Sequence, residues 1–189
     1  MRVIAGQVRG FRLEVPEGPH VRPTSDRVRE ALFSILMPKL EGARFLDLFA
    51  GSGANGIEAL SRGASHAVFV DDDARTLQTV YRNLKKTHLL TQSRCLRLRL
   101  PEGLSQLRQT FDIIFADPPY AFAEYPRLLE SVAGNDCPEG ALLDTQGLFV
   151  METHKRTAVP EEAHGTHGML KHFRASRYGD TLLHFYHWE

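Results

Sequence analysis

The sequence predicts an α/β fold, a doubly wound and mostly parallel sheet with helices on both faces. Two observations lead to this class. From residue 44 onwards, short apolar runs of strand character alternate with segments whose apolar residues recur every three or four positions. The last two strand-like runs break this alternation, because only Tyr178-Gly179-Asp180 separates them and so short a turn joins antiparallel strands. We therefore expect a seven-stranded sheet with an antiparallel edge formed by the carboxyl-terminal part of the chain.

The segment before this alternation is expected to form an extension of the sheet. Residues 2–5 and 8–15 have the pattern of a β-hairpin around Gly6, and a Pro- and Gly-rich connection follows over residues 16–23. A helix should then begin near Thr24 or Ser25, either of which can cap it, and should end at Pro38. The first 23 residues are thus predicted to be a hairpin and linker rather than a domain.

The remaining elements follow from hydrophobic periodicity. The expected strands are 44–49, 66–70, 94–99, 111–116, 147–152, 169–175 and 181–188. The expected helices are 54–62, 74–86, 102–109 and 124–133. In the second of these helices, the spacing of Leu77, Val80, Tyr81 and Leu84 is typical of a helix face that packs on a sheet.

Length and composition favour one ordinary globular domain over residues 1–189. The chain has no apolar run of the roughly 18 residues that a membrane span needs, and its first residues do not resemble a signal peptide. We therefore expect a cytoplasmic protein. Cys95 and Cys137 are too few for a disulfide framework and are expected to be free thiols. The histidine pairs His164/His167 and His184/His187 lack the arrangement of a metal site, so no metal is expected.

Charge is balanced overall but unevenly distributed. The formal net charge is zero, which alone gives no reason to expect a nucleic-acid partner. Residues 1–12, however, contain Arg2, Arg9 and Arg12 without an acid, and residues 75–108 contain eight Lys or Arg against Glu102 alone. Such blocks are either solvated faces or the footprint of a polyanion, and the sequence leaves both interpretations open.

A glycine-rich loop, Gly51-Ser52-Gly53-Ala54-Asn55-Gly56, separates the first parallel strand from its helix. Glycines at this point let the chain turn sharply and let a ligand approach the backbone at the amino terminus of the helix. Asp71 ends the second strand, where this fold commonly has an acid that binds a ribose. The two features predict a ligand that contains adenosine, either a nicotinamide dinucleotide or S-adenosylmethionine.

Asp47 favours the second of these ligands. It lies within the first strand, just before the loop, where a carboxylate would repel a pyrophosphate but attract the ammonium group of a methionine moiety. The alternative is that Asp47 is a structural acid that caps a loop amide. Asp73 is expected to cap the helix that begins near Ala74.

The stretch FADPPY, residues 115–120, ends the fourth parallel strand in an unusual way. Two prolines remove two N–H donors and fix two φ angles, so the turn is rigid and the strand cannot continue. In a doubly wound sheet, ligands bind at the carboxyl ends of the strands, so this turn and the glycine loop should face each other across one crevice. Asp117 and the Pro118 carbonyl could then accept hydrogens from a nucleobase amine, while Tyr120 stacks on the base. A simple Asp-Pro-Pro turn without a ligand is the alternative.

These stretches also resemble a known family. The segments RVIAGQVRGFRLEVP, RPTSDRVREALFSIL, FLDLFAGSGANGIEALSRGA, FVDDDARTLQTVYRNL and FDIIFADPPY are similar to those of bacterial 16S rRNA guanine-N2 methyltransferases of the RsmD type, and RYGDTLLHFY shows a weaker similarity. RPTSDRVRE is the most specific of them. The sequence departs from the family pattern at Asp71, where the family usually has Glu, and in RLRLPEG, which lacks an acid or amide for the adenine. The adenine contacts are therefore unassigned.

The resemblance implies a class I, Rossmann-like methyltransferase that uses S-adenosylmethionine to methylate the N2 amine of a guanine in small-subunit ribosomal RNA. The implied partner is an assembled or assembling 30S particle, without DNA. The catalytic candidates are Asp117, Pro118, Pro119 and Tyr120. The cofactor-binding candidates are Asp47, Phe49, Ala50, Gly51, Gly53, Asp71 and Asp72. The RNA-binding candidates are Arg2, Arg9, Arg12, Arg22 and Thr24.

Other functions explain less of the sequence. A nicotinamide-dependent oxidoreductase leaves Asp47 and the Asp117–Tyr120 turn without a role. A DNA amino-methyltransferase shares both motifs but normally has a target-recognition segment for which 189 residues leave little room. A protein-glutamine methyltransferase usually has Asn in place of Asp117. A non-catalytic RNA-binding assembly factor that keeps a cofactor pocket is the alternative from a different class.

Overall fold

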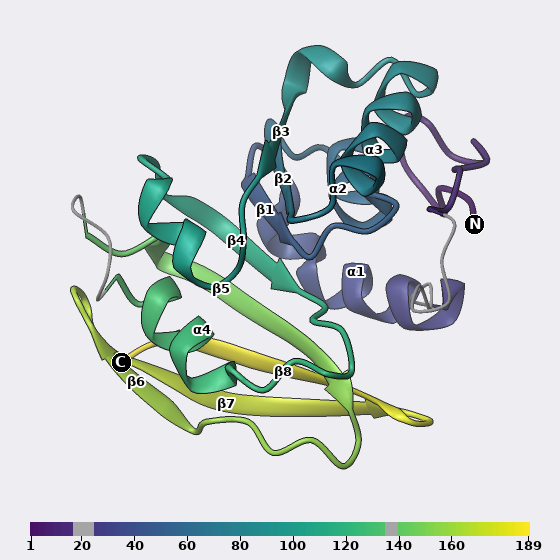
Figure 1. Cartoon of the computed structure of the whole chain (residues 1–189). Coiled ribbons are helices and arrows are strands. Elements are labelled where there is room, and N and C mark those ends of the chain that lie inside the picture. The colour runs from purple at the N-terminus through teal and green to yellow at the C-terminus, as the bar shows by residue number, and fades with distance from the viewer. Residues whose placement is uncertain (17–24, 135–139) are drawn as a thin grey trace. The chain divides into compact units, whose positions relative to one another are not determined.

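We analysed a computed structural model of the chain, which describes residues 1–16, 25–134 and 140–189 (Figure 1). The chain divides into two compact units, Met1–Arg97 and Leu98–Glu189, and each is described by itself. The single-domain organisation expected from the sequence stays a prediction. Within the described residues, no helix is long and apolar enough to cross a bilayer.

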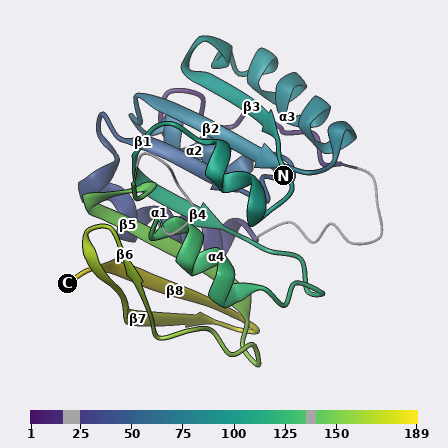
Figure 2. The same ribbon diagram turned by 60° about the vertical axis from the view of Figure 1, so that its left-hand side comes forward.

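The first unit has the predicted alternation of strands and helices. Its elements are α1 (Asp26–Leu40), β1 (Arg44–Leu48), α2 (Ala54–Ser61), β2 (His66–Asp71), α3 (Ala74–Lys86), the 3₁₀ helix η1 (Leu90–Gln92) and β3 (Ser93–Arg97). β1 and β3 each pair with β2 in parallel, so the strand order in this unit is β3-β2-β1. The helices α2 and α3 both contact β2 (Figures 1 and 2). The carboxyl ends of β1 and β2 therefore lie at one edge, where the glycine loop and Asp71 follow.

The helix starts in this unit obey the capping rules that the sequence suggested. The Ser25 side chain accepts the Val28 N–H at the start of α1, and the Asp73 carboxylate accepts the Arg75 N–H at the start of α3. The predicted end of α1 is wrong, because the helix continues past Pro38 to Leu40. A proline in the last turn removes only one backbone hydrogen bond, which a helix end tolerates.

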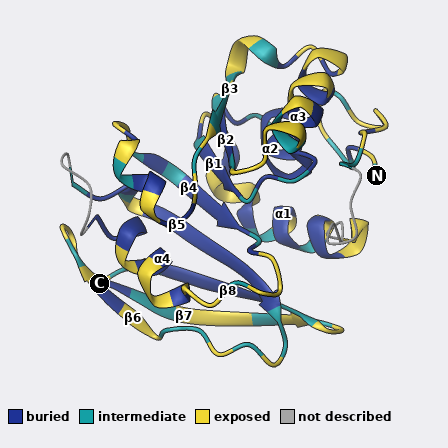
Figure 3. Ribbon diagram, in the orientation of Figure 1, coloured by how far each residue is buried: buried dark blue, intermediate teal, exposed yellow. Residues whose placement is uncertain are grey.

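The predicted packing of α3 on the sheet is confirmed, except at one residue of the predicted face. Val80 and Leu84 of α3 are fully buried, but Tyr81 of the same face is 54% exposed. In Figure 3 the outer surface of α3 is exposed along the helix while its inner surface is buried. The apolar stripe that packs on the sheet is therefore narrower than the spacing of apolar residues indicated.

The amino-terminal segment contains an antiparallel contact but no strands. Arg2 and Arg12 form an isolated bridge, and the Val3 N–H donates to the Phe11 carbonyl at 3.0 Å. The predicted β-hairpin is thus reduced to a single bridge, because several N–H groups between its two arms donate to α2 instead. Among them, the Gln7 N–H donates to the Ser61 carbonyl of α2 at 2.7 Å.

The second unit contains the antiparallel edge. Its elements are η2 (Glu102–Gln106), β4 (Phe111–Ala116), α4 (Tyr125–Val132), β5 (Leu143–His154), β6 (Glu162–Gly165), β7 (Gly168–Tyr178) and β8 (Thr181–Trp188). β4 and β5 are parallel, and the order in this unit is β4-β5-β8-β7-β6 with β6, β7 and β8 antiparallel to their neighbours. The predicted turn at Gly179 is confirmed, with a left-handed φ of 65°.

The predicted strand count of seven is too low. The described residues form three strands in the first unit and five in the second, and the additional strand is β6. β6 has only four residues and pairs only with β7, so it has too few positions for a visible alternation. The predicted helix over 102–109 is the short 3₁₀ helix η2, in which a Cβ on Gly103 would lie 2.7 Å from the Leu98 side chain.

Candidate functional site

The loop between β1 and α2 is built from left-handed residues. Phe49, Gly51 and Gly53 have φ angles of 59°, 54° and 75°. The Ala50 N–H donates to the Val70 carbonyl at 3.0 Å, and the Gly53 N–H donates to the Ala50 carbonyl at 2.7 Å, which ties the loop to β2 and closes it. A positive φ is unfavourable for Phe49 and is maintained only where surrounding contacts enforce it. The loop therefore has one defined conformation.

The glycines of this loop serve different purposes. A Cβ on Gly56 would lie 2.3 Å from the ring of Phe69, and one on Gly53 would lie 3.0 Å from Val80, so both glycines allow close packing. A Cβ on Gly51 would meet nothing nearer than the Phe49 carbonyl oxygen at 3.9 Å. Only at Gly51 does the backbone border open space, which is the property expected where a ligand approaches the main chain.

Asp71 lies at the end of β2 and is bonded to the loop on one side and to the next turn on the other. Its Oδ2 accepts the Gly51 N–H at 3.2 Å, and its Oδ1 accepts the Asp73 N–H at 3.1 Å. Burial raises the pKa of this carboxyl above its ordinary value, while the two backbone hydrogen bonds oppose that shift. Each carboxylate oxygen has two acceptor positions, so Asp71 retains the capacity to accept hydroxyl groups of a ribose.

Asp47 is buried beneath the loop, with 1% of its surface exposed. Its Oδ2 accepts the Gly56 N–H of the first turn of α2 at 2.9 Å. This is the loop-capping role that the sequence left open as the alternative. The carboxylate stabilises the helix start, where free N–H groups favour a negative charge. Its predicted contact with a methionine ammonium group stays a prediction.

The turn after β2 contacts the end of β3. Asp72 and Asp73 are exposed, and Asp73 is the cap of α3 rather than a ligand-facing acid. The backbone carbonyl of Asp72 accepts the Nε–H of Arg97, the last residue of β3, at 2.9 Å. The sequence assigned no role to Arg97, because nothing in a linear pattern shows that β3 ends beside this turn.

A buried ion-pair cluster holds the amino-terminal segment against α2. Glu58 of α2 is fully buried, and its carboxylate accepts the N–H groups of Ile4 and Ala5 at 2.8 and 3.0 Å. The same carboxylate lies 2.7 Å from Arg62 Nε and 3.8 Å from the Nε of the fully buried Arg29. The sequence did not predict this cluster, because the N–H groups that Glu58 accepts lie 54 and 53 residues away along the chain.

Arg29, which belongs to the family-specific stretch RPTSDRVRE, has a structural role. Its Nη2 donates to the Arg2 carbonyl at 2.6 Å and to the Asp26 carboxylate at 2.9 Å. Burial lowers the pKa of the Arg29 guanidinium, and the nearby charges of Glu58 and Asp26 oppose that shift. Arg29 thus fastens the amino-terminal segment to α1.

The RNA-binding candidates differ in their surroundings. Arg2 lies 3.6 Å from the carboxylate of Asp26. Arg9 and Arg12 are exposed and form no ion pair within the described parts of the chain. Arg22 and Thr24 lie outside the described residues, as does Cys137, whereas Cys95 carries a free thiol.

The Asp117–Tyr120 turn follows β4 directly. Asp117 is half-buried, Pro118 is buried, and Tyr120 is 67% exposed. The turn is closed by a hydrogen bond from the Phe122 N–H to the Pro119 carbonyl at 2.8 Å. The strand and the turn therefore lie where the sequence placed them, and the tyrosine ring is left facing outward.

Two residues beside this turn were not predicted. The ring of His154 lies 6.1 Å from the ring of Tyr120 in an edge-to-face arrangement. Burial raises the pKa of Tyr125, the first residue of α4, and the charge of Asp117 adds to the shift, whereas a hydrogen bond with Thr157 opposes it. His154 ends β5, the parallel neighbour of β4, so the rule that strand ends share one edge could have identified it.

The described residues contain no group of three or more His, Cys, Asp and Glu side chains that could hold a metal ion. In the first unit, the polar side chains at the ends of β1 and β2 are carboxylates that bond to backbone amides. In the second unit, a carboxylate and an exposed tyrosine ring follow β4.

The fold and the loop define an α/β class I methyltransferase. The chain belongs to the family described as Conserved hypothetical protein 95, whose model matches residues 1–187. It is 43% identical to ribosomal RNA small subunit methyltransferase D of Escherichia coli K12 over 85% of this chain and 78% of that protein. It is 39% identical to YlbH of Bacillus subtilis, named as a candidate rRNA methyltransferase, over 98% of both chains.

A solved structure agrees with these relationships. The structure of yhhF from Escherichia coli, described as a candidate methyltransferase, matches with a TM-score of 0.78 and 32% identity over 100% of this chain and 98% of that chain. The family resemblance inferred from the sequence motifs is therefore confirmed.

Proposed function

We propose that this chain transfers the methyl group of S-adenosylmethionine to the exocyclic N2 amine of a guanine in small-subunit (16S) ribosomal RNA. The relatives named as small-subunit rRNA methyltransferases support the reaction and the class of substrate. The observation that supports an amine as the acceptor is the rigid turn after β4, where Asp117 precedes two prolines and an exposed tyrosine ring.

The residues of the first unit fit the cofactor. Gly51 offers backbone without a side chain beside open space, and Asp71 has acceptor positions for ribose hydroxyls. Phe49, Ala50 and Gly53 hold the loop in its conformation, and Asp47 fixes the start of α2. Asp72 follows Asp71 and is exposed on the same turn. When bound, S-adenosylmethionine supplies an electrophilic methyl group on a sulfonium, which is a good leaving group.

The residues of the turn act on the amine. The amine of guanine is a weak nucleophile, because its lone pair is delocalised into the ring. Hydrogen bonds from the amine to the Asp117 carboxylate and the Pro118 carbonyl orient it and favour a localised lone pair. Tyr120 stacks on the base, and the prolines keep both acceptors in place. Positioning therefore supplies more of the rate than a strong general base would.

The substrate is expected to be an assembled or assembling 30S particle, in the cytoplasm and without DNA. Arg9 and Arg12, both exposed, are suited to phosphate contacts. Arg2 is less suited to a phosphate contact than Arg9 and Arg12, because the carboxylate of Asp26 already lies beside it.

The test is methyl transfer to small subunits purified from a strain that lacks this activity, followed by mass spectrometry of the RNA. We expect one methylated guanine whose added methyl group lies on N2, and a strongly reduced rate of transfer by the Asp117→Ala variant. Methylation of DNA but not RNA would support a DNA amino-methyltransferase instead. Binding of the subunit without any transfer by the parent protein would support an assembly factor.

A further inference from the structure

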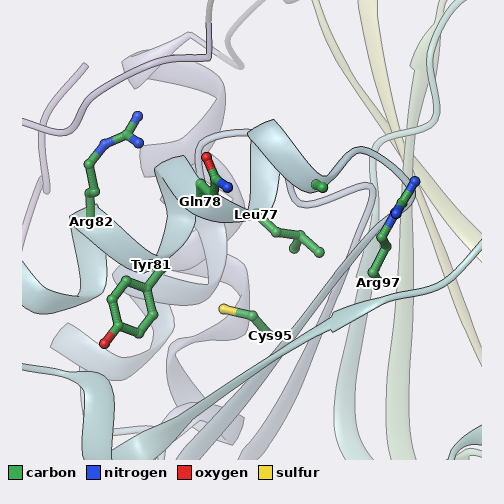
Figure 4. A pocket seen from close by; sticks show the side chains of 7 residues that line it. Leu77, Gln78, Tyr81, Arg82, Cys95 and Arg97 are labelled. Carbon is green, nitrogen blue, oxygen red and sulfur yellow. The ribbon is translucent and has the colours of Figure 1, made fainter.

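A pocket lies between α3 and β3 of the first unit. Figure 4 shows Leu77 and Tyr81 of α3 and Cys95 and Arg97 of β3 around the same space. Its volume is about 440 Å³, within the range of roughly 300–1,000 Å³ usual for small-molecule sites. The pocket is therefore large enough for a nucleobase with its sugar.

The wall of this pocket includes an aromatic ring that the core does not use. Tyr81 is 54% exposed, whereas Val80 and Leu84 of the same helix are completely buried. Leu77 lies one helical turn before Tyr81, and the thiol of Cys95 faces the helix from β3. The pocket thus has an apolar floor with a ring at its side, as in sites where a base stacks on an aromatic residue.

The two elements that form the pocket are strongly basic. Residues 74–97 contain six Lys or Arg and no Asp or Glu, although the net charge of the whole chain is zero. All six of these side chains are exposed: Arg75, Arg82, Lys85, Lys86, Arg94 and Arg97. A polyanion is the partner that complements such a surface.

Two of these cations lie in the pocket wall with their positions already fixed. Arg82 is held by Glu14 at 2.7 Å and by Thr79 at 2.9 Å, and Arg97 is held by the Asp72 carbonyl at 2.9 Å. A guanidinium has five N–H donors, so each side chain retains donors for a phosphate.

We propose that this pocket binds an unstacked nucleotide of the RNA substrate, with the base against Tyr81 and the flanking phosphates on Arg82 and Arg97. The inference rests on the proposed function, because it assigns to the same ribosomal RNA a second contact outside the reacting guanine. An acidic protein segment would match the charge, but it would leave the apolar floor and the ring without a partner.

The test compares matched pairs of variants. Tyr81→Ala is compared with Phe173→Ala, which removes another ring, 49% exposed, from β7 of the second unit. Arg97→Ala is compared with Arg177→Ala, because the Nε of Arg177 also donates to a backbone carbonyl, that of Gly179, at 3.0 Å. Binding of a labelled single-stranded RNA of ten nucleotides is measured by fluorescence anisotropy between 50 and 300 mM salt. Calorimetry with S-adenosylmethionine is run on every variant.

We expect Tyr81→Ala to weaken RNA binding about five- to hundredfold, the range found when a stacking ring is removed, and Tyr81→Phe to bind like the parent. Arg97→Ala should reduce the slope of log affinity against log salt by about 0.7, the value for one phosphate contact with a single strand. The two control variants should leave RNA binding unchanged, and Tyr81→Ala should leave cofactor binding unchanged.

Three outcomes would overturn the inference. In the first, Tyr81→Ala binds RNA with the affinity and salt slope of the parent. In the second, Tyr81→Ala loses affinity for S-adenosylmethionine, which would make the pocket part of the cofactor site. In the third, an acidic peptide competes with RNA for the parent but not for Tyr81→Ala, which would make the occupant a protein. A parent protein that binds RNA through Tyr81 but methylates no ribosomal RNA would contradict the proposed function and leave the pocket assignment standing.

Discussion

The glycine loop of the first unit and the Asp117–Tyr120 turn of the second differ in their side-chain environment: carboxylates bond to the backbone around the loop, whereas the turn exposes a tyrosine ring. Around the loop, the carboxylates of Asp47 and Asp71 accept backbone N–H groups of the loop, the helix start and the next turn. At the turn, Tyr120 points outward with 67% of its surface exposed. The comparison shows that the conformation of the loop is fixed by hydrogen bonds within the first unit, whereas the turn of the second unit exposes an aromatic ring.

The same contrast extends to the interiors of the two units. In the first unit, buried polar side chains such as Glu58 and Asn83 bond to the backbone of distant segments. In the second unit, the buried polar cluster joins side chains: His184 Nδ1 lies 3.2 Å from His172 Nε2, and His184 Nε2 lies 3.1 Å from Thr153 Oγ1. Substitutions in the first unit should therefore loosen chain segments, while the second unit should respond to pH.

The largest expected effect is that of Glu58→Ala. The substitution removes the acceptor of the Ile4 and Ala5 N–H groups and of Arg62 Nε, and it takes the negative charge away from beside the buried guanidinium of Arg29. We expect the free energy of unfolding to fall by about 3–5 kcal/mol, as found when one partner of a buried ion pair is removed. Chemical denaturation measures it, with Glu14→Ala as the control, because the exposed Glu14–Arg82 pair should contribute at most about 1 kcal/mol. Equal losses in both variants would contradict the anchoring role of Glu58.

The second prediction concerns acid and the second unit. Burial and the neighbouring His172 lower the pKa of His184 from 6.5 to about 4. The folded state therefore binds this proton less readily than the unfolded chain, so the stabilisation is complete above pH 6.5 and is lost as the pH falls towards 4. The free energy of unfolding should fall by about 3 kcal/mol over this pH range. The charge of Glu161, which lies close to His172, opposes the lowering of the His184 pKa.

Unfolding curves between pH 7 and 4 test this prediction. His184→Gln should flatten the dependence relative to the parent, while the exposed His164→Gln should leave it as it is. A His184→Gln protein with the pH dependence of the parent would show that other groups cause the acid lability.

The third prediction separates the role of Asp117 in methyl transfer from cofactor binding at the glycine loop. Asp117→Ala should reduce the rate of methyl transfer about a hundredfold or more, since a reacting group held in the wrong orientation loses about that much. Cofactor affinity should change by no more than a few-fold, and Tyr120→Phe should stay near the parent rate because the ring face supplies the stacking. Asp144→Ala is the control, because that carboxylate caps the Gln146 N–H in the same unit. Full activity of Asp117→Ala would make the turn purely structural.

The fourth prediction addresses the loop. Asp71→Ala should weaken the binding of S-adenosylmethionine by about 1–3 kcal/mol, the usual loss for hydrogen bonds to a charged group. Asp73→Ala is the matched control: it removes the cap of α3 and should lower stability by about 0.5–2 kcal/mol without changing cofactor affinity. Calorimetry and thermal unfolding separate the two effects. Tight binding of NAD instead of S-adenosylmethionine would refute the cofactor assignment.

The smallest expected effect is that of removing Arg9 and Arg12. Each lost phosphate contact should reduce the salt slope of RNA binding by about 0.7–0.9, with cofactor binding and stability unchanged. Arg2→Ala is a useful comparison, because Arg2 lies beside Asp26 and should contribute less to RNA binding. Unaltered affinity and slope in the double variant would exclude the amino-terminal segment from the RNA surface and leave the basic face of α3 and β3 as that surface.

Local signals predicted much of this molecule. The glycine loop, the ends of β1 and β2, the Asp73 cap and the turn after β4 depend on a few adjacent residues, and the structure has them where the sequence indicated. The exposure of Tyr81 was not predictable, because helical spacing shows which residues share a face but not how far the sheet extends beneath them. Glu58 and the His172–His184 pair were missed because their partners lie far away in sequence.

The contacts of Glu58 also bear on the order in which the chain folds. The hydrogen bond to the Ile4 N–H spans 54 residues, so forming it requires closing a long loop. The entropy of that closure has to be overcome before the contact contributes any stability. We therefore expect the amino-terminal segment to reach its native position after α2 has formed and packed. On that order of events, removing its bonds should mainly speed unfolding and should change the folding rate little.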